Sequence, residues 1–273
     1  MIEQPPEKPG FSSLMKSGKD PQWVPWTIQQ TFYGVLLTLI PWIGFNLLLL
    51  GAEGNQTLTK PLSLSEDLGA AVLQIIFTAL VEGAFLIVPL YYAHKTLIRQ
   101  ESLPHWRALL ETLGLRRFHV VRTLPWFVGL MILIIGVNIL YSSAITALHL
   151  PLTTNDQVVF EESKYAPISV YAILAGSVLI APLCEEIFFR GFALPGLLHD
   201  LSPTWSILIS SLLFAVAHAD FGSFVPLFII GLCLGFLRLR TGSTWASISL
   251  HVLNNLLSSV FIILAMHNVN LPF

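Results

Sequence analysis

Charged side chains are scarce in this chain of 273 residues. Asp, Glu, Lys and Arg make up 11% of the sequence, whereas they make up about 25% of a soluble domain. Hydrophobic residues account for 54%, and the mean hydropathy is +0.73. The net charge is only −2, and no basic cluster outside residues 95–123 would attract a nucleic acid. The composition therefore predicts an integral membrane protein with no nucleic-acid partner.

Cysteine is also scarce, and a signal-peptide pattern is missing. Cys184 and Cys233 both lie in apolar segments, which argues against a disulfide framework and favours small packing residues. The first 26 residues contain five prolines and several charges, but no apolar run that ends in small residues. We expect residues 1–27 to form a flexible cytoplasmic tail.

Long apolar runs are abundant, and a helix needs about 20 apolar residues to cross the hydrocarbon core. The fifth and sixth runs are short and are joined by "HADFGSF", which leaves a re-entrant segment or an eighth helix open. We find no internal repeat. The sequence predicts an all-α integral membrane protein, a multi-pass bundle of seven to eight transmembrane helices. The seven runs are roughly 28–51, 68–93, 124–148, 168–190, 204–220, 223–239 and 243–266.

The distribution of Lys and Arg predicts the orientation of this bundle. If the N-terminus is cytoplasmic, Lys60 and Lys164 are the two basic residues on the outer side, and the C-terminus is also outside. We expect an integral protein of a bacterial or archaeal cell membrane. The other twelve basic residues then fall on the cytoplasmic side: Lys8, Lys16, Lys19, Lys95, Arg99, Arg107, Arg116, Arg117, Arg122, Arg190, Arg238 and Arg240.

The segment "LPHWRALLETLGLRRF", within 95–123, carries Trp106, Leu109, Leu110 and Leu113 at helical spacing beside three arginines. This pattern is typical of an amphipathic helix that lies on the cytoplasmic face with its bases near lipid phosphates. A purely structural connector fits the same pattern. Membrane lipid is therefore one expected partner.

Polar residues inside the spans are unexpected, because a charge at mid-membrane costs about 2.5–3.5 kcal/mol. Such residues persist where they pair, line a cavity or take part in chemistry. Glu82 is the one outlying acid of the second span, and the sequence assigns it no role. The other such residues concentrate in the C-terminal third: Glu185, Glu186, Arg190, His218, His251, Asn254 and Asn255.

Helical spacing separates the three charges of the fourth span. Glu186 and Arg190 are four residues apart, about 40° around the helix axis, so they can pair directly. Glu185 and Arg190 are about 140° apart, which leaves Glu185 without a partner on its own helix. His251 and Asn255 are again four apart and project together.

These residues suit the activation of water. Glu185 can act as general base with His218 sharing the water, while His251 and Asn255 can donate to a developing oxyanion. Polar residues of this kind can also simply bridge membrane helices. No Ser or Cys is placed as a nucleophile beside a base, and the HExxH signature of zinc proteases is missing.

Three short patterns carry a family resemblance. "EEIFFR" (185–190), "FAVAH" (214–218) and "HVLNN" (251–255) match EExxxR, FxxxH and HxxxN in order on apolar helices. Together they resemble the CAAX protease and bacteriocin-processing family, the intramembrane glutamic endopeptidases that include the type II CAAX prenyl proteases. The flanks "FRGFALPGL" and "LRLRTGSTWASISLHVLNNLL" are also similar, so the resemblance covers about residues 168–265.

The resemblance implies a membrane-embedded endopeptidase without a metal or other cofactor. Its substrate would be a peptide or protein, either a prenylated CAAX-like tail or a leader peptide. Residues 161–273 would form the catalytic core, and residues 28–160 the N-terminal helices. By resemblance, Glu185 and His218 activate water and His251 and Asn255 form the oxyanion site. Glu186 and Arg190 would support the site or contact the peptide.

Two other readings fit the same residues. In one, Glu185, His218 and His251 bind a catalytic zinc with water in the fourth position. In the other, the chain is a transporter or a non-catalytic scaffold or immunity protein, since intramembrane acids and histidines also mark ion pathways. Transporters typically contain inverted repeats, and this sequence has none that we detect.

The depths of the predicted site residues disagree. At about 1.5 Å per residue, Glu185 lies roughly 7 Å from the cytoplasmic end of its span, whereas His218 lies roughly 20 Å and His251 roughly 12–15 Å from that side. They can meet only if the fifth helix starts early or the helices tilt strongly. Pro203 favours an early start, because proline suits a first helical turn.

Overall fold

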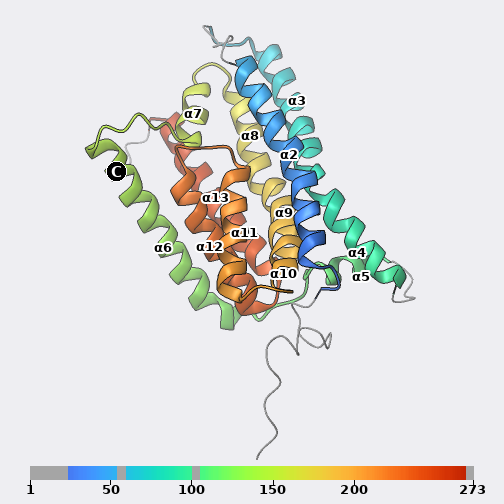
Figure 1. The fold of residues 1–273 in the computed structure, drawn as a ribbon. Helices are drawn as coiled ribbons and strands as arrows, with labels where there is room; N and C mark the ends of the chain where they lie inside the picture. The colour runs from blue at the N-terminus through green and yellow to red at the C-terminus, as the bar shows by residue number, and fades with distance from the viewer. Residues whose placement is uncertain (1–23, 54–59, 100–104, 269–273) are drawn as a thin grey trace, which may run out of the picture.

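The computed structural model describes residues 24–53, 60–99 and 105–268. Within them the chain folds entirely into helices and connecting turns, without a strand (Figure 1). Most of the predicted tail at 1–27 lies outside the described residues, as do Lys8, Lys16 and Lys19.

The described residues contain six helical segments that are long and apolar enough to cross a membrane, and a shorter apolar helix. This confirms an all-α, multi-pass membrane protein. In chain order these seven apolar segments are α2 (Ile28–Glu53), α3 (Leu64–Gly83) with α4 (Ile87–Arg99), α6 (Val120–Ala147), α8 (Pro167–Leu179) through α10 (Leu194–Leu197), α11 (Pro203–Ala217), α12 (Phe224–Thr241) and α13 (Thr244–Met266). The short one is α11.

The helices of the C-terminal half form the centre of the bundle, and those of the N-terminal half flank it (Figure 1). Helix α3 packs along α8, and α6 runs beside α12. The outer faces of these flanking helices carry exposed large apolar side chains, such as Leu37, Leu73 and Leu140, which are about 70% exposed. Such faces suit contact with lipid, because a lipid-facing surface needs no polar cover.

The fourth span is longer and less regular than the sequence predicted. After α8 it continues as α9 (Ala181–Glu186), a π-helix η2 (Ile187–Ala193) and α10, so it ends at Leu197 and not at residue 190. Pro182 and Pro195 each stand in the first turn of a short segment, where proline costs no internal hydrogen bond.

This extension resolves the disagreement in depth between Glu185 and His218. Glu185 now lies twelve residues before the end of its span, about 18 Å, and His218 lies fifteen residues after the start of α11, about 22 Å. The two residues therefore agree to within one helical turn. The predicted span end at residue 190 was wrong because the apolar run continues through buried residues of α10.

Two short helices connect the spans. Helix α5 (Trp106–Thr112) forms where the amphipathic segment was predicted, and Leu113 after it is fully buried. The Thr244 backbone N–H donates to Gly114 O and its hydroxyl to Leu113 O, so this segment is tied to the start of α13. Helix α7 (Asn155–Glu162) was not predicted.

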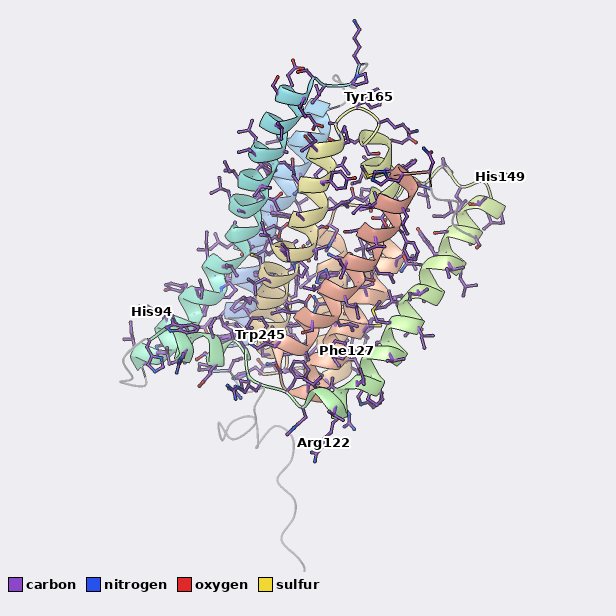
Figure 2. All side chains as sticks on the ribbon, turned by 180° about the vertical axis from the view of Figure 1, so that it is seen from behind. His94, Arg122, Phe127, His149, Tyr165 and Trp245 are labelled. Atoms are coloured by element: carbon purple, nitrogen blue, oxygen red, sulfur yellow. The ribbon has the colours of Figure 1, made fainter. Side chains whose placement is uncertain are left out.

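The basic residues gather at one end of the bundle. Arg122 and His94 lie at that end, whereas His149 and Tyr165 lie at the other (Figure 2). Arg190, counted among the interfacial basic residues from the sequence, is instead fully buried inside the fourth span. It therefore carries no information about orientation.

Candidate active site

The ion pair predicted within the fourth span is present. Arg190 Nη1 lies 2.7 Å from Glu186 Oε1, and both side chains are fully buried. Arg190 Nη2 also donates to the Gly231 carbonyl of α12 at 3.0 Å. The guanidinium carbon lies 4.5 Å from the centre of the Phe214 ring, a cation–π distance. Arg190 therefore joins the fourth span to both α11 and α12.

His251 connects α13 to the same ion pair. Its Nδ1 lies 3.1 Å from Glu186 Oε1, so this one oxygen accepts from both His251 and Arg190. We assign the proton to Nδ1, since its neighbour is a carboxylate that can only accept. The other nitrogen, Nε2, is then directed toward Glu185, 4.0 Å from its Oε2.

His218 approaches Glu185 from α11. Its Nδ1 lies 2.8 Å from the Phe214 carbonyl oxygen, one turn earlier, which again assigns the proton to Nδ1. Its Nε2 lies 3.7 Å from Glu185 Oε2. The residue caps the C-terminus of α11, and the chain turns directly after it at Ala219, whose φ is +50°.

Glu185 is the point on which the two imidazoles converge. Its side chain is about 9% exposed, and Oε2 has no hydrogen-bond partner among the described residues. Separations of 3.7 and 4.0 Å are too long for direct hydrogen bonds but fit a bridging water. Phe214 supports both histidines, with ring centres 4.5 Å from His218 and 5.6 Å from His251.

Asn255 lies one turn beyond His251 on α13 and faces α8. Its Nδ2 donates to the Ser177 carbonyl at 2.8 Å, and its Oδ1 accepts from Asn254 at 3.1 Å. One N–H of its amide is therefore engaged with α8. Its part in an oxyanion site stays a prediction.

A cavity of about 110 Å³ lies against Glu185 and His218. Two of its polar side chains, Glu82 and Trp42, come from the N-terminal helices and were not among the predicted site residues. Glu82 had a signal in the sequence as the one acid of the second span, whereas Trp42 had none. The cavity is lined by Trp42, Glu82, Phe85, Glu185, Phe189, Ala217 and His218.

Comparison with known proteins agrees with the three motifs. Residues 167–257 match the family described as type II CAAX prenyl endopeptidase Rce1-like. This segment contains all six predicted site residues, so the resemblance inferred from the sequence is confirmed over it. No solved structure matches the chain.

Two curated proteins are similar to parts of the chain. "Putative membrane peptidase YdiL" of Bacillus subtilis (strain 168) is 28% identical over 101 residues, 37% of this chain and 40% of that protein. "Uncharacterized 24.3 kDa protein" of Escherichia coli is 33% identical over 156 residues, 54% of this chain and 66% of that protein. The chain thus spans less than two thirds of the first relative's length.

Proposed function

We propose that this chain is an intramembrane endopeptidase that hydrolyses a peptide bond with water activated by Glu185 and His218. The observation that carries the proposal is the convergence of a buried carboxylate with two imidazole Nε2 atoms at 3.7 and 4.0 Å, beside a cavity. Both imidazoles are fixed by a hydrogen bond at Nδ1, so that each directs its Nε2 toward Glu185 Oε2.

In the proposed reaction, water lies between Glu185 Oε2 and His218 Nε2. Glu185 removes a proton from this water as its oxygen attacks the carbonyl carbon of the scissile bond. His251 and Asn255 donate to the oxyanion that develops. Donation from His251 to the oxyanion requires a proton on Nε2 as well as on Nδ1. The nitrogen of the leaving peptide must also gain a proton as the carbon–nitrogen bond breaks.

Substitution of Glu185 tests this proposal. Glu185→Gln keeps the size of the side chain but cannot accept a proton from water, so we expect a loss of about 10²–10⁴-fold or more in cleavage. The purified protein in detergent is incubated with a peptide library that includes prenylated CAAX-like and leader-type sequences, and products are identified by mass spectrometry. Wild-type activity in Glu185→Gln would exclude the mechanism.

Glu161→Gln is the matched control for this experiment. It makes the same chemical change in helix α7, where the carboxylate is 63% exposed and pairs with Lys164. Such an exposed pair contributes little to stability. We expect the control to cleave like the wild type, so that a loss in Glu185→Gln can be assigned to the site.

A zinc-dependent peptidase is the second candidate, with Glu185, His218 and His251 as ligands. Both imidazoles donate Nδ1–H to an oxygen and present Nε2, as metal-binding histidines do. The observed separations of 3.7 and 4.0 Å exceed the about 3.3 Å between ligand atoms around tetrahedral zinc. Within the described residues, no three His, Cys, Asp or Glu side chains are grouped to hold a metal ion.

A chelator experiment separates the two candidates. Full cleavage in the presence of a strong chelator supports activation by the carboxylate alone. Loss of cleavage, with recovery on adding zinc, supports the metal-dependent reaction instead.

A further inference from the structure

Glu82 is a buried acid for which the reaction proposed above has no use. It lies at the end of α3, one residue before the final Gly83, and lines the same cavity as Glu185. Its Oε2 is covered and has no hydrogen-bond partner among the described residues. No ion pair in the described part of the chain includes it. Burying a carboxyl group in an apolar span costs free energy. Such groups therefore persist mainly where they pair, line a cavity or take part in chemistry.

The backbone leaves α-helical geometry on both sides of this cavity. Directly after Glu82 and Gly83, residues Ala84–Leu86 form a 3-10 turn, η1. Directly after Glu185 and Glu186, the π-helix η2 begins, and the two irregular segments pack against each other. Irregular turns of this kind inside long helices are frequent at functional sites. Glu82 lies just before η1 and Glu185 just before η2, and both acids line the same cavity.

The two carboxyl groups have different neighbours. Glu185 faces the Nε2 atoms of His218 and His251. Glu82 lines the cavity together with Trp42 and Phe85, whose ring centres lie 4.7 Å apart. The cavity of about 110 Å³ has room for a few waters only. Two ionised carboxylates there would repel one another, and of the two acids Glu185 is the one with imidazoles beside it.

We propose that Glu82 is the general acid of the reaction and gives its proton to the nitrogen of the leaving amine. This inference rests on the proposed peptidase function. Two acids whose surroundings favour opposite protonation states can divide the acid and base roles between them. Glu82 is then the proton donor, and Glu185 the acceptor.

The steps balance as follows. The water oxygen bonds to the carbonyl carbon while Glu185 takes one water proton. The carbon–nitrogen bond of the tetrahedral intermediate then breaks, and its electron pair, left on nitrogen, takes the proton of Glu82. The proton on Glu185 returns to Glu82 through water in the cavity, which restores both groups.

The experiment compares two leaving groups on one substrate. The first is the fastest-cleaved peptide from the library, and the second is the same peptide with a thioester at the scissile bond. An amine needs a proton to leave, whereas a thiolate leaves as a stable anion. We expect Glu82→Gln to lower peptide cleavage by about 10²–10⁴-fold and thioester cleavage by less than about tenfold. Glu185→Gln is expected to lower both.

The thioester also reports whether the variant is folded, since only a folded site accelerates its hydrolysis above the rate in buffer alone. Glu161→Gln, the exposed control, is expected to cleave both substrates like the wild type. Undiminished peptide cleavage by Glu82→Gln, or an equal loss on both substrates, would overturn the assignment of Glu82. Failure of the wild type to cleave any peptide would instead overturn the proposed function itself.

Discussion

Glu186 holds the buried charges of the site together. A single oxygen, Oε1, accepts from Arg190 at 2.7 Å and from His251 at 3.1 Å. Both members of the ion pair are fully buried, so removing one leaves an uncompensated charge in the interior. That loss typically costs about 3–5 kcal/mol, much more than the net worth of the intact pair.

The effect of a substitution at Arg190 should therefore depend on whether the new side chain keeps the positive charge. Arg190→Lys keeps the charge, but a single ammonium cannot reproduce the planar fork that reaches both Glu186 and the Gly231 carbonyl. We expect reduced but measurable peptide cleavage. Arg190→Gln removes the buried positive charge that compensates Glu186 and should lower the free energy of unfolding by about 3–5 kcal/mol. Thermal unfolding in detergent and the peptide assay measure the two effects.

Arg240→Lys is the matched control, because Arg240 lies at the exposed end of α12 over the Trp126 ring. It should leave both stability and cleavage near the wild-type values. A stable, fully active Arg190→Gln protein would show that the buried pair is dispensable.

At the scale of single residues, the sequence predicted those contacts that depend on local spacing. The Glu186–Arg190 pair followed from a separation of four residues. The convergence of Glu185 with His218 followed only from the order of motifs. The participation of Glu82 and Trp42 in the cavity could not be predicted, because it depends on how α2 and α3 pack against the C-terminal helices.

The lengths of the apolar runs predicted the positions of the long helices well, but not the π-helical segment within the fourth span. The predicted runs at 28–51 and 243–266 end close to the observed helices Ile28–Glu53 and Thr244–Met266. Hydropathy has no means of distinguishing an α-helix from a π-helix, so η2 and the extension to Leu197 were missed. Helix α7 was missed because it is polar. The capping box formed by Thr154 and Gln157 is the signal that could have found it.

The start of α8 depends on a side chain from α3. Asp67 is 2% exposed, and its carboxylate accepts the backbone N–H groups of Ile168 and Ser169, each at 2.8 Å. Its Oδ1 also accepts the Ser169 hydroxyl at 2.6 Å. These N–H groups have no partner inside their own helix, and a negative charge at a helix N-terminus is favourable. The contact fixes the fourth span, which carries Glu185, against the second span, which carries Glu82.

Removing this carboxylate should destabilise the bundle. Asp67→Ala leaves two buried N–H donors unpaired, and we expect a loss of about 1–3 kcal/mol. Asp67→Asn keeps one acceptor oxygen and should lose less. Asp200→Ala, an acid at an exposed position, is the control. Thermal unfolding in detergent measures the differences. An unchanged unfolding temperature in Asp67→Ala would contradict the role given to this cap.

The whole molecule carries its basic residues asymmetrically. Among the described residues, with Arg190 and Arg238 buried in the interior, seven Lys and Arg residues lie on one side and two, Lys60 and Lys164, on the other. Arg122 marks the basic end, and Tyr165, next to Lys164, marks the opposite end (Figure 2). The seven apolar segments of the described residues alternate in direction, so the start of α2 and the end of α13 lie on opposite sides (Figure 1). Because cytoplasmic loops carry the excess of basic residues, we propose that α2 starts on the cytoplasmic side.

Labelling of single cysteines in intact cells tests this orientation. We expect Glu161→Cys, in helix α7, to react with a membrane-impermeant maleimide from outside. Arg107→Cys, in the connector helix α5, should react only after the cells are opened, because α5 lies at the basic end. Cys184 and Cys233 are both buried, so the parent protein should give little background. The opposite labelling pattern would reverse the orientation. The residues of the proposed site would then be the same, but the substrate would reach them from the other side of the membrane.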